Sequence, residues 1–465
     1  MKYLIKYIVL IFIFSLSIII FLFIIYRAYN ICFTHDESLS YTILRGDDLW
    51  LITANNHWLN TILSFITSKL FGYSEIILRL SNVLSFIPFA YFCYRLVSQK
   101  INYSIITIIC FSFILLNQFL LDFFSLFRGY GLAMSFFTGC IFYFLQLINQ
   151  YNKKQLFLAL SFSVLTIYAN YSFLYPIISL QFMFLYYHFR RSLNRSFHLK
   201  EIIILFSCQI LLLAPALFNV LQLKQKNELY FGSDDGFFQG TFQSVLQYTY
   251  PVLLTHYGLY IIKIIFILIF ISYFILIFRH STLRPIFYII SMTIMIPVIL
   301  YVTLGIKYSI ERSAIYWTIL IGIGFSKLLN VCLKNIKMRF IFPLIICIGL
   351  LIFLSVYSFI RVANTEYTTA WKCDADTYKM LKDLDKIAPK NKTYYLGINW
   401  LFEPSINYYR EVKQFNWLHP VTREGILNKE YDYYYIFSTD KQYLKRNYKK
   451  IKEYPLSSTY LLKRK

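Results

Sequence analysis

Apolar runs long enough to cross a membrane recur along almost the whole chain. A helix that spans the hydrocarbon core needs about 20 apolar residues. Here 58% of the residues are hydrophobic and the mean hydropathy is +0.54, a composition built for lipid. A scan at span length predicts about eleven transmembrane helices, near residues 7–28, 77–97, 103–121, 130–148, 156–170, 172–188, 201–220, 257–278, 285–304, 313–330 and 340–360. We therefore expect an all-α polytopic membrane protein.

The distribution of Lys and Arg predicts the orientation of these spans, because both residues favour cytoplasmic loops. With the N-terminus in the cytoplasm, the inner connections receive most of the loop cations, namely Lys100, Lys153, Lys154, Arg190, Arg191, Arg195, Lys200, Arg279, Arg284, Lys327, Lys334, Lys337 and Arg339. We expect a multi-pass protein of the inner (plasma) membrane, with its first loop and C-terminal segment outside. Much of the formal charge of +23 is then interfacial, so it does not indicate nucleic-acid binding.

The composition changes near residue 360 and divides the chain into two predicted domains. Residues 1–360 contain all the predicted spans, whereas residues 361–465 are richer in Lys, Asp, Asn and Tyr. In this second part the residue pattern predicts helices over 374–387 and 440–452 and strands over 392–397 and 431–437. We expect a small extracytoplasmic α/β domain.

The loop after the first span contains an acidic pair, Asp36-Glu37, just outside the predicted bilayer. Residues 36–44 and 56–66 of this loop carry apolar side chains at helical spacing, which predicts two amphipathic helices in the interface. Thr34 and Glu37 also have the spacing of a helix capping box, a purely structural use of the same residues. The acidic pair is well placed for chemistry on a lipid headgroup.

Three segments near the N-terminus follow one another in an order known from one enzyme family. Asp36-Glu37 is followed by Asn55-Asn56-His57-Trp58-Leu59-Asn60 and then by Glu75-Ile76-Ile77-Leu78-Arg79-Leu80-Ser81. This order resembles the C superfamily of glycosyltransferases, specifically its family 39 and protein-O-mannosyltransferase-like group, which includes the lipid A aminoarabinose transferases. Trp58-Leu59 stands where that group has Pro-Pro, and no Pro precedes Ser81.

Weaker likeness to this group comes from Arg128-Gly129-Tyr130 and from residues 311–316. The resemblance implies a sugar donor linked to polyprenyl phosphate and an acceptor met at the outer face of the membrane. It also implies inversion at the anomeric carbon.

The residue types fit that chemistry. Displacing a lipid phosphate from a sugar needs a carboxylate to take the proton of the incoming hydroxyl, and cations to stabilise the leaving phosphate. Asp36 is the predicted base, Glu37 would orient an acceptor, a metal or Asp36 itself, and Asp122 is a second carboxylate from another loop. The residues predicted to bind substrate are His57, Arg128, Tyr130, Lys307 and Arg312, whose cations are candidates for the phosphate.

Each of these residues also has a structural interpretation. Asp122 and Arg128 would serve equally as a salt bridge or as interface anchors, and Lys307 and Arg312 as snorkelling cations at span ends. His57 is equally well explained as a histidine at the membrane interface whose ring makes its hydrogen bonds within the protein. The sequence supplies no identifiable metal partners for His57, so no cofactor is predicted, although a divalent metal is compatible with the pattern.

Two other function classes fit a membrane protein of this kind. One is a transporter or flippase of a lipid-linked sugar, and the other is a polymerase or ligase of lipid-linked oligosaccharides. Transporters often place broken helices and ionisable residues near the bilayer midplane. This chain has only 15 Gly and 11 Pro, and its acids collect at the predicted outer rim. The pattern favours a transferase and leaves the acceptor open among a lipid, a polysaccharide and a protein.

Overall fold

Helices occupy every predicted span in a computed structural model of the chain, which describes residues 2–46, 48–98, 105–192, 199–253, 256–335, 338–388, 392–426, 431–443 and 448–465. The helices at the predicted spans are α1 (Lys2–Asn30), α4 (Glu75–Ser98), α5 (Ile105–Leu115), α7 (Tyr130–Asn149), α8 (Lys153–Ala169), α9 (Leu174–Ser192), α10 (Leu199–Gln225), α12 (His256–Arg279), α13 (Arg284–Leu304), α14 (Tyr316–Asn335) and α15 (Met338–Val362). Within the described residues, seven helices are long and apolar enough to cross a membrane by length and composition. The predicted polytopic all-α class is therefore confirmed. The predicted inner cations Lys100, Arg195 and Lys337 lie outside the described residues.

The third predicted span, over residues 103–121, is shorter than expected. Helix α5 ends at Leu115, and a separate short helix, α6 (Gln118–Asp122), follows it. The break occurs at Asn117, whose side-chain oxygen accepts a hydrogen bond from the backbone N–H of Leu120 (3.3 Å) and so caps α6. The chain from Gln118 to Tyr130 is then buried throughout, which carries Arg128 into the interior.

Helix α7 lies at the centre of the bundle, where it packs against α4, α8 and α9. Its apolar stretch is 83% buried inside the protein, compared with 22% for that of α1. An apolar helix that stays exposed in a membrane protein faces lipid. Helix α1 is therefore peripheral, and α7 forms the core.

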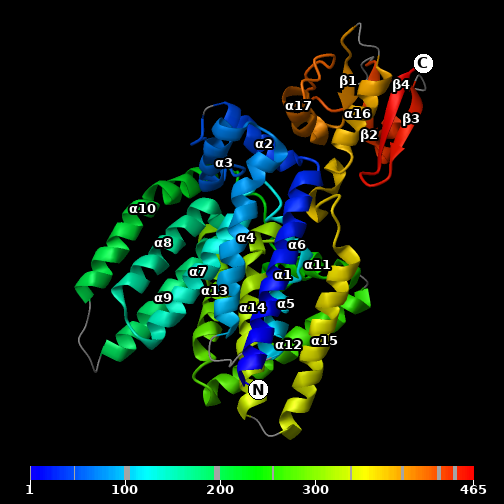
Figure 1. Cartoon of the computed structure of the whole chain (residues 1–465). Coiled ribbons are helices and arrows are strands. Elements are labelled where there is room, and N and C mark those ends of the chain that lie inside the picture. The colour runs from blue at the N-terminus through cyan, green and yellow to red at the C-terminus, as the bar shows by residue number, and fades with distance from the viewer. Residues whose placement is uncertain are drawn as a thin grey trace.

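The first-loop helices and the C-terminal domain lie at one end of the bundle, and the N-terminus lies at the other (Figure 1). The two amphipathic stretches of the first loop form α2 (His35–Arg45) and α3 (Trp58–Phe71). The short connecting helices are η1 (Tyr171–Phe173), η2 (Phe237–Phe242), α11 (Gln243–Thr249), η3 (Pro251–Leu253), η4 (Glu311–Ala314) and η5 (Thr369–Asp374).

The C-terminal domain is built on a four-stranded sheet with the strand order β1-β2-β4-β3. Its elements are α16 (Thr377–Ile387), β1 (Leu396–Ile398), η6 (Trp400–Phe402), α17 (Glu403–Val412), β2 (Tyr433–Phe437), η7 (Ser438–Tyr443), β3 (Tyr448–Tyr454) and β4 (Thr459–Arg464). Strand β1 runs parallel to β2, whereas β4 pairs antiparallel with both β2 and β3.

The helix predicted over residues 440–452 is wrong, because the described part of this segment forms the end of η7 and the start of β3. Pairing with β4 overrides the local residue pattern that predicted a helix. The small α/β domain itself is present as expected.

The first loop and the C-terminal domain share one hydrophobic core. Phe33, just before α2, stacks on Tyr408 of α17 with 3.9 Å between the ring centroids. The backbone N–H of Phe33 donates to the hydroxyl of Tyr409 at 2.7 Å. Tyr41 and Leu44 of α2 belong to the same core. The C-terminal domain is thus packed firmly onto α2, the helix that carries the acidic pair.

Candidate functional site

The acidic pair lies in the first turn of α2, whose start is fixed by a complete capping box. The backbone N–H of Thr34 donates to Glu37 Oε2 (3.0 Å), and Thr34 Oγ1 accepts from the backbone N–H of Glu37 (3.4 Å). Asp36 is therefore the second residue of a rigid helix start, and a negative charge is favourable there because of the helix dipole.

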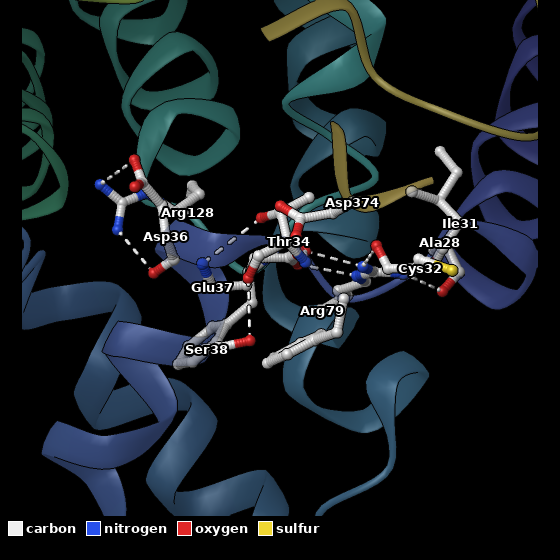
Figure 2. A network of polar contacts seen from close by, with 12 residues as sticks. Ala28, Ile31, Cys32, Thr34, Asp36, Glu37, Ser38, Arg79, Arg128 and Asp374 are labelled. Atoms are coloured by element: carbon white, nitrogen blue, oxygen red, sulfur yellow. Dashed lines mark hydrogen bonds and ion pairs between the residues drawn. The ribbon is translucent and has the colours of Figure 1, made fainter. Parts of the chain in front are cut away.

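Glu37 forms a buried ion pair with Arg79 of α4. The guanidinium donates two hydrogen bonds to the two carboxylate oxygens, at 2.8 and 2.7 Å, and neither side chain is exposed. The backbone N–H of Phe127 adds a further bond to Glu37 at 2.6 Å. Arg79 Nη1 donates to the carbonyls of Ala28 and Ile31, and Nη2 donates also to that of Cys32, all at or just after the end of α1. This network ties α1, α2 and α4 together (Figure 2).

Asp36 occupies a different environment on the other side of α2 (Figure 2). Its Oδ2 lies 3.4 Å from Nη2 of Arg312 and 3.7 Å from Nη2 of Arg128, and its side chain is 14% exposed. Burial alone would raise the pKa of the Asp36 carboxyl, but the two guanidinium charges and a hydrogen bond from the Trp371 indole outweigh that effect and lower the pKa. Asp36 is therefore ionised at neutral pH.

Arg128 is held by the first loop as well as by Asp36. Its Nη1 donates to Asn55 Oδ1 (2.6 Å) and to Ser40 Oγ (3.0 Å), and its side chain is 3% exposed. The next residue, Gly129, lets the backbone after Arg128 pass close to the carbonyl oxygen of Ala169, because a Cβ at position 129 would lie 2.0 Å from that oxygen. Arg128 is thus a fixed charge.

Arg312 is the more accessible of the two arginines, with 21% of its side chain exposed. It lies in η4, where its guanidinium is sandwiched between the rings of Phe231 (4.5 Å) and Trp371 (4.9 Å). Tyr130 also hydrogen-bonds to it. A stacked guanidinium with exposed edges retains free N–H groups for an incoming anion.

His57 and Tyr130 adjoin this cluster, with 5.3 Å between their ring centroids. His57 occupies the N-cap position of α3 and is buried. Burial and the charges of Arg128 and Arg312 lower the pKa of His57 far below its ordinary value, so that the ring is neutral.

Asp122 belongs to another buried ion pair, with Arg27 of α1. Gln118 Nε2 donates to the same carboxylate at 2.6 Å, and the backbone N–H of Thr369 donates to it at 3.3 Å. Arg27 also holds the carbonyls of Asn364 and Tyr367. The salt bridge predicted as an alternative for Asp122 thus exists, but its partner is Arg27 and not Arg128.

Lys307 lies apart from these residues, and its ammonium is 2.9 Å from the exposed carboxylate of Asp234.

The structure brings together Asp36, Arg128, Arg312, Tyr130 and His57, and it places Glu37 and Asp122 in separate buried ion pairs. Within the described residues, no three His, Cys, Asp or Glu side chains are grouped so that they could hold a metal ion.

The segment between α15 and the C-terminal domain contributes residues that have no signal in the sequence. Trp371 of η5 is 6% exposed and touches both Asp36 and Arg312. Asp374, at the end of η5, accepts from the backbone N–H of His35 at 2.8 Å and from Ser405 Oγ at 3.1 Å. Burial raises the pKa of Asp374 to about 7. Arg79, by contrast, stands in a segment that the sequence had singled out, without an assigned role.

An apolar cavity of about 260 Å³ opens at the outer face of the bundle, since Phe238 and Phe270 of its lining are 66% and 46% exposed. Its walls come from α12, α13, α14, α15 and η2, and they include Phe242, Tyr273, Trp317 and Phe325. Trp317 lies on the helix that follows directly after η4, the short helix that carries Arg312.

No protein-family model matches the chain, and no curated protein matches it in sequence. Among solved structures, it is similar to the crystal structure of ArnT from Cupriavidus metallidurans bound to undecaprenyl phosphate, with a TM-score of 0.52 and 9% identity over 97% of both chains. The apo structure of the same ArnT gives a TM-score of 0.51 at 9% identity, over 96% of this chain and 97% of ArnT. This likeness shows a shared fold. The predicted resemblance to the lipid A aminoarabinose transferases of the C superfamily is thereby confirmed at the level of the fold.

Proposed function

We propose that this chain transfers a monosaccharide from a polyprenyl-phosphate-linked donor to a hydroxyl group of a lipid, polysaccharide or protein acceptor. The observation that carries the proposal is one ionised and partly accessible carboxylate, Asp36, facing two arginines at an end of the membrane bundle. The shared fold with ArnT, which was crystallised with undecaprenyl phosphate, supports the class of donor. The predicted loop charges support a reaction at the outer face of the plasma membrane, with the N-terminus inside.

In the proposed mechanism, Asp36 is the general base. Its carboxylate takes the proton of the acceptor hydroxyl while the hydroxyl oxygen bonds to the anomeric carbon. The bond between that carbon and the phosphate oxygen breaks, polyprenyl phosphate leaves with the electron pair, and the configuration at the carbon inverts. Arg312 and Arg128 stabilise the charge of the leaving phosphate.

The pairing of Asp36 with the arginines also suggests how its basicity rises when it is needed. In the free protein, the two guanidinium groups lower the pKa of Asp36. A donor phosphate that binds these guanidinium groups would replace Asp36 as their partner. Its own negative charge would then raise the pKa of Asp36 and favour proton transfer.

The other predicted residues have supporting roles in this proposal. Glu37 and Asp122 position α2 and the segment that follows α15, because their carboxylates are fully engaged by Arg79 and Arg27. Tyr130 and His57 border the sugar, and Lys307 attracts the anionic headgroup from the rim. The apolar cavity beside α14 supports binding of the polyprenyl chain.

The proposal is tested by mass spectrometry of polyprenyl-phosphate sugars and outer glycans in cells that carry the wild-type chain, Asp36→Asn or no gene. We expect the donor to accumulate and one sugar to be missing from a glycan in the last two strains. Loss of a general base typically costs about 10² to 10⁴ in rate. Asp48→Asn is the matched control, because Asp48 is an exposed carboxylate in the same loop.

A different pattern would favour the transporter. If Asp36→Asn has the glycans of the wild type while deletion does not, the carboxylate is not a base and the transferase mechanism is refuted. Measuring which face of the membrane holds the accumulated donor separates failed transfer from failed delivery, since a flippase defect retains the donor at the inner face.

A further inference from the structure

Three buried nitrogens without hydrogen-bond partners lie where α3 meets the turn between α8 and α9. They are His57 Nε2, Trp58 Nε1 and Asn170 Nδ2. The exposed fractions of these residues are 9%, 5% and 4%, respectively. A buried donor without a partner lowers the stability of the fold by about 1 to 3 kcal/mol. A cluster of such groups therefore indicates a binding site for a molecule that supplies the missing hydrogen bonds.

Contacts between the two segments bring these residues into one cluster. The ring of Trp58 lies 6.1 Å from that of Tyr168 and 6.3 Å from that of Tyr171, the residues on either side of Ala169-Asn170. A Cβ at Gly129 would lie 2.9 Å from His57 Cβ and 2.0 Å from the carbonyl oxygen of Ala169, so His57 and Ala169 lie against the same glycine. The start of α3 therefore rests directly on this turn.

The cluster reaches the surface through Trp50, which is 56% exposed and meets Trp58 edge to face at 5.1 Å. Towards the interior, His57 contacts Tyr130, which in turn hydrogen-bonds to Arg312. The cluster thus lies beside the arginines proposed to hold the donor phosphate. Indole rings next to unpaired polar groups are a suitable environment for a sugar, which presents apolar ring faces and hydroxyl edges.

We infer that His57, Trp58 and Asn170 form a subsite for the sugar ring of the donor, and that this subsite selects a neutral hydroxylated sugar over an aminated one. This inference rests on the proposed function. Trp58 Nε1 and Asn170 Nδ2 are donors only, so they match hydroxyl oxygens and cannot accept from an ammonium group. The neutral His57 ring supplies no negative charge, and the neighbouring Arg128 and Arg312 repel a cationic sugar.

The test measures lipid binding to the purified full chain in nanodiscs, by native mass spectrometry. The probes are undecaprenyl phosphate alone and the same lipid carrying a neutral hexose, a neutral pentose or a 4-aminopentose. We expect a neutral sugar to increase affinity over the bare lipid about tenfold, and the aminopentose to give no gain. The tenfold gain corresponds to about 1.4 kcal/mol.

Two variants test whether the gain in affinity from the sugar arises at Trp58 and Asn170. Trp58→Phe keeps the ring and removes Nε1–H, so we expect it to reduce the sugar-dependent gain about fivefold without changing the affinity for the bare lipid. Asn170→Asp keeps the side-chain oxygen that accepts from Ser172 (backbone N 2.9 Å, Oγ 2.7 Å), but it replaces a donor with a negative acceptor. We expect it to shift the preference towards the aminopentose lipid. Trp400→Phe, at a half-exposed indole of η6 that meets His35 and not the cluster, is the matched control.

The possible outcomes separate the subsite from the proposed function. If the bare lipid binds, but no neutral sugar adds affinity and both variants behave like the wild type, water alone fills the cluster and the subsite is refuted, while the proposed donor class stands. If the bare lipid does not bind at all, the proposed function and the subsite both fail. If the aminopentose binds best to the wild-type chain, the selectivity for neutral sugars is refuted.

Discussion

Asp36 and Glu37 are neighbours in the sequence, yet they are surrounded very differently. Glu37 is fully buried, and Arg79 holds it at 2.7 and 2.8 Å. Asp36 is partly exposed, and its two arginine contacts are looser, at 3.4 and 3.7 Å. One helix turn therefore carries a carboxylate whose oxygens are fully hydrogen-bonded within the protein on one side, and a loosely paired carboxylate on the other.

This difference separates two functions within one acidic pair. A carboxylate whose partners all come from the protein core stabilises that core, and breaking such a pair leaves a buried charge uncompensated. A carboxylate with long contacts can exchange its partners for a phosphate and accept a proton. We therefore expect the Asp36 side of α2 to govern rate and the Glu37 side to govern folding.

The largest effect on stability should come from Glu37→Gln. The substitution leaves the Arg79 guanidinium buried without a counter-charge, which typically costs about 3 to 5 kcal/mol. Asp36→Asn removes longer contacts, to an Arg128 that Ser40 and Asn55 also hold, so we expect a smaller fall in the midpoint of thermal unfolding in detergent. Circular dichroism or tryptophan fluorescence on both purified variants measures this contrast. Equal destabilisation by the two substitutions would remove the distinction between the two sides.

The second prediction concerns the arginines that face Asp36. Arg312→Ala should weaken binding of undecaprenyl phosphate about 10- to 100-fold, because it removes a charge-assisted pair to the phosphate. Arg312→Lys should retain part of the affinity, since a lysine keeps the charge but loses the planar fork. Titration of the lipid into nanodiscs measures each affinity.

Lys307→Ala should have a smaller effect than Arg312→Ala, because Asp234 already holds the Lys307 ammonium. Lys226→Ala, an exposed cation bonded to the carbonyl of Ile52, is the matched control. An equal loss for Arg312→Ala and Lys226→Ala would indicate that only net charge matters, and Arg312 would then have no specific role.

The positions of the helices could be predicted because apolar length is a local property of the sequence. The pairing of charges could not, because it depends on which segments meet in three dimensions. Arg79 is an instructive case: an arginine within an apolar span indicates a buried carboxylate partner, and that signal was available. Trp371 carried no such signal, since it reaches Asp36 only because the segment after α15 folds back onto the bundle, where its ring packs on Phe123.

The third prediction concerns the link between Trp371 and Asp36. Trp371→Phe removes the indole N–H that bonds to the carboxylate but keeps a ring against Arg312. That bond lowers the pKa of Asp36, so its loss should raise this pKa and move the acidic limb of the pH–rate profile to higher pH. At neutral pH the carboxylate stays ionised, so we expect the turnover number there to change by less than about threefold. A uniform loss with an unchanged profile would indicate a purely structural role.

The fourth prediction concerns Asp374, which secures the C-terminal domain to the start of α2. Burial raises the pKa of Asp374 to about 7 in the folded protein, whereas an unfolded Asp titrates near ~4. The folded state therefore binds more protons than the unfolded state between these values. Stability should then fall as the pH rises through this window, by at most ~1.4 kcal/mol per pH unit, and level off above it. Thermal unfolding of the wild type from pH 5 to pH 8 measures this slope.

Asp374→Asn provides the control for that measurement, because it is nearly isosteric and does not titrate. Its side-chain oxygen can still accept from the backbone N–H of His35, so the docking of η5 onto α2 should persist. We expect the pH dependence between pH 5 and 7 to flatten in this variant while its stability at pH 5 stays near that of the wild type. If the slope is unchanged, another group titrates in this range. The contact between the C-terminal domain and the acidic pair would then be independent of the charge on Asp374.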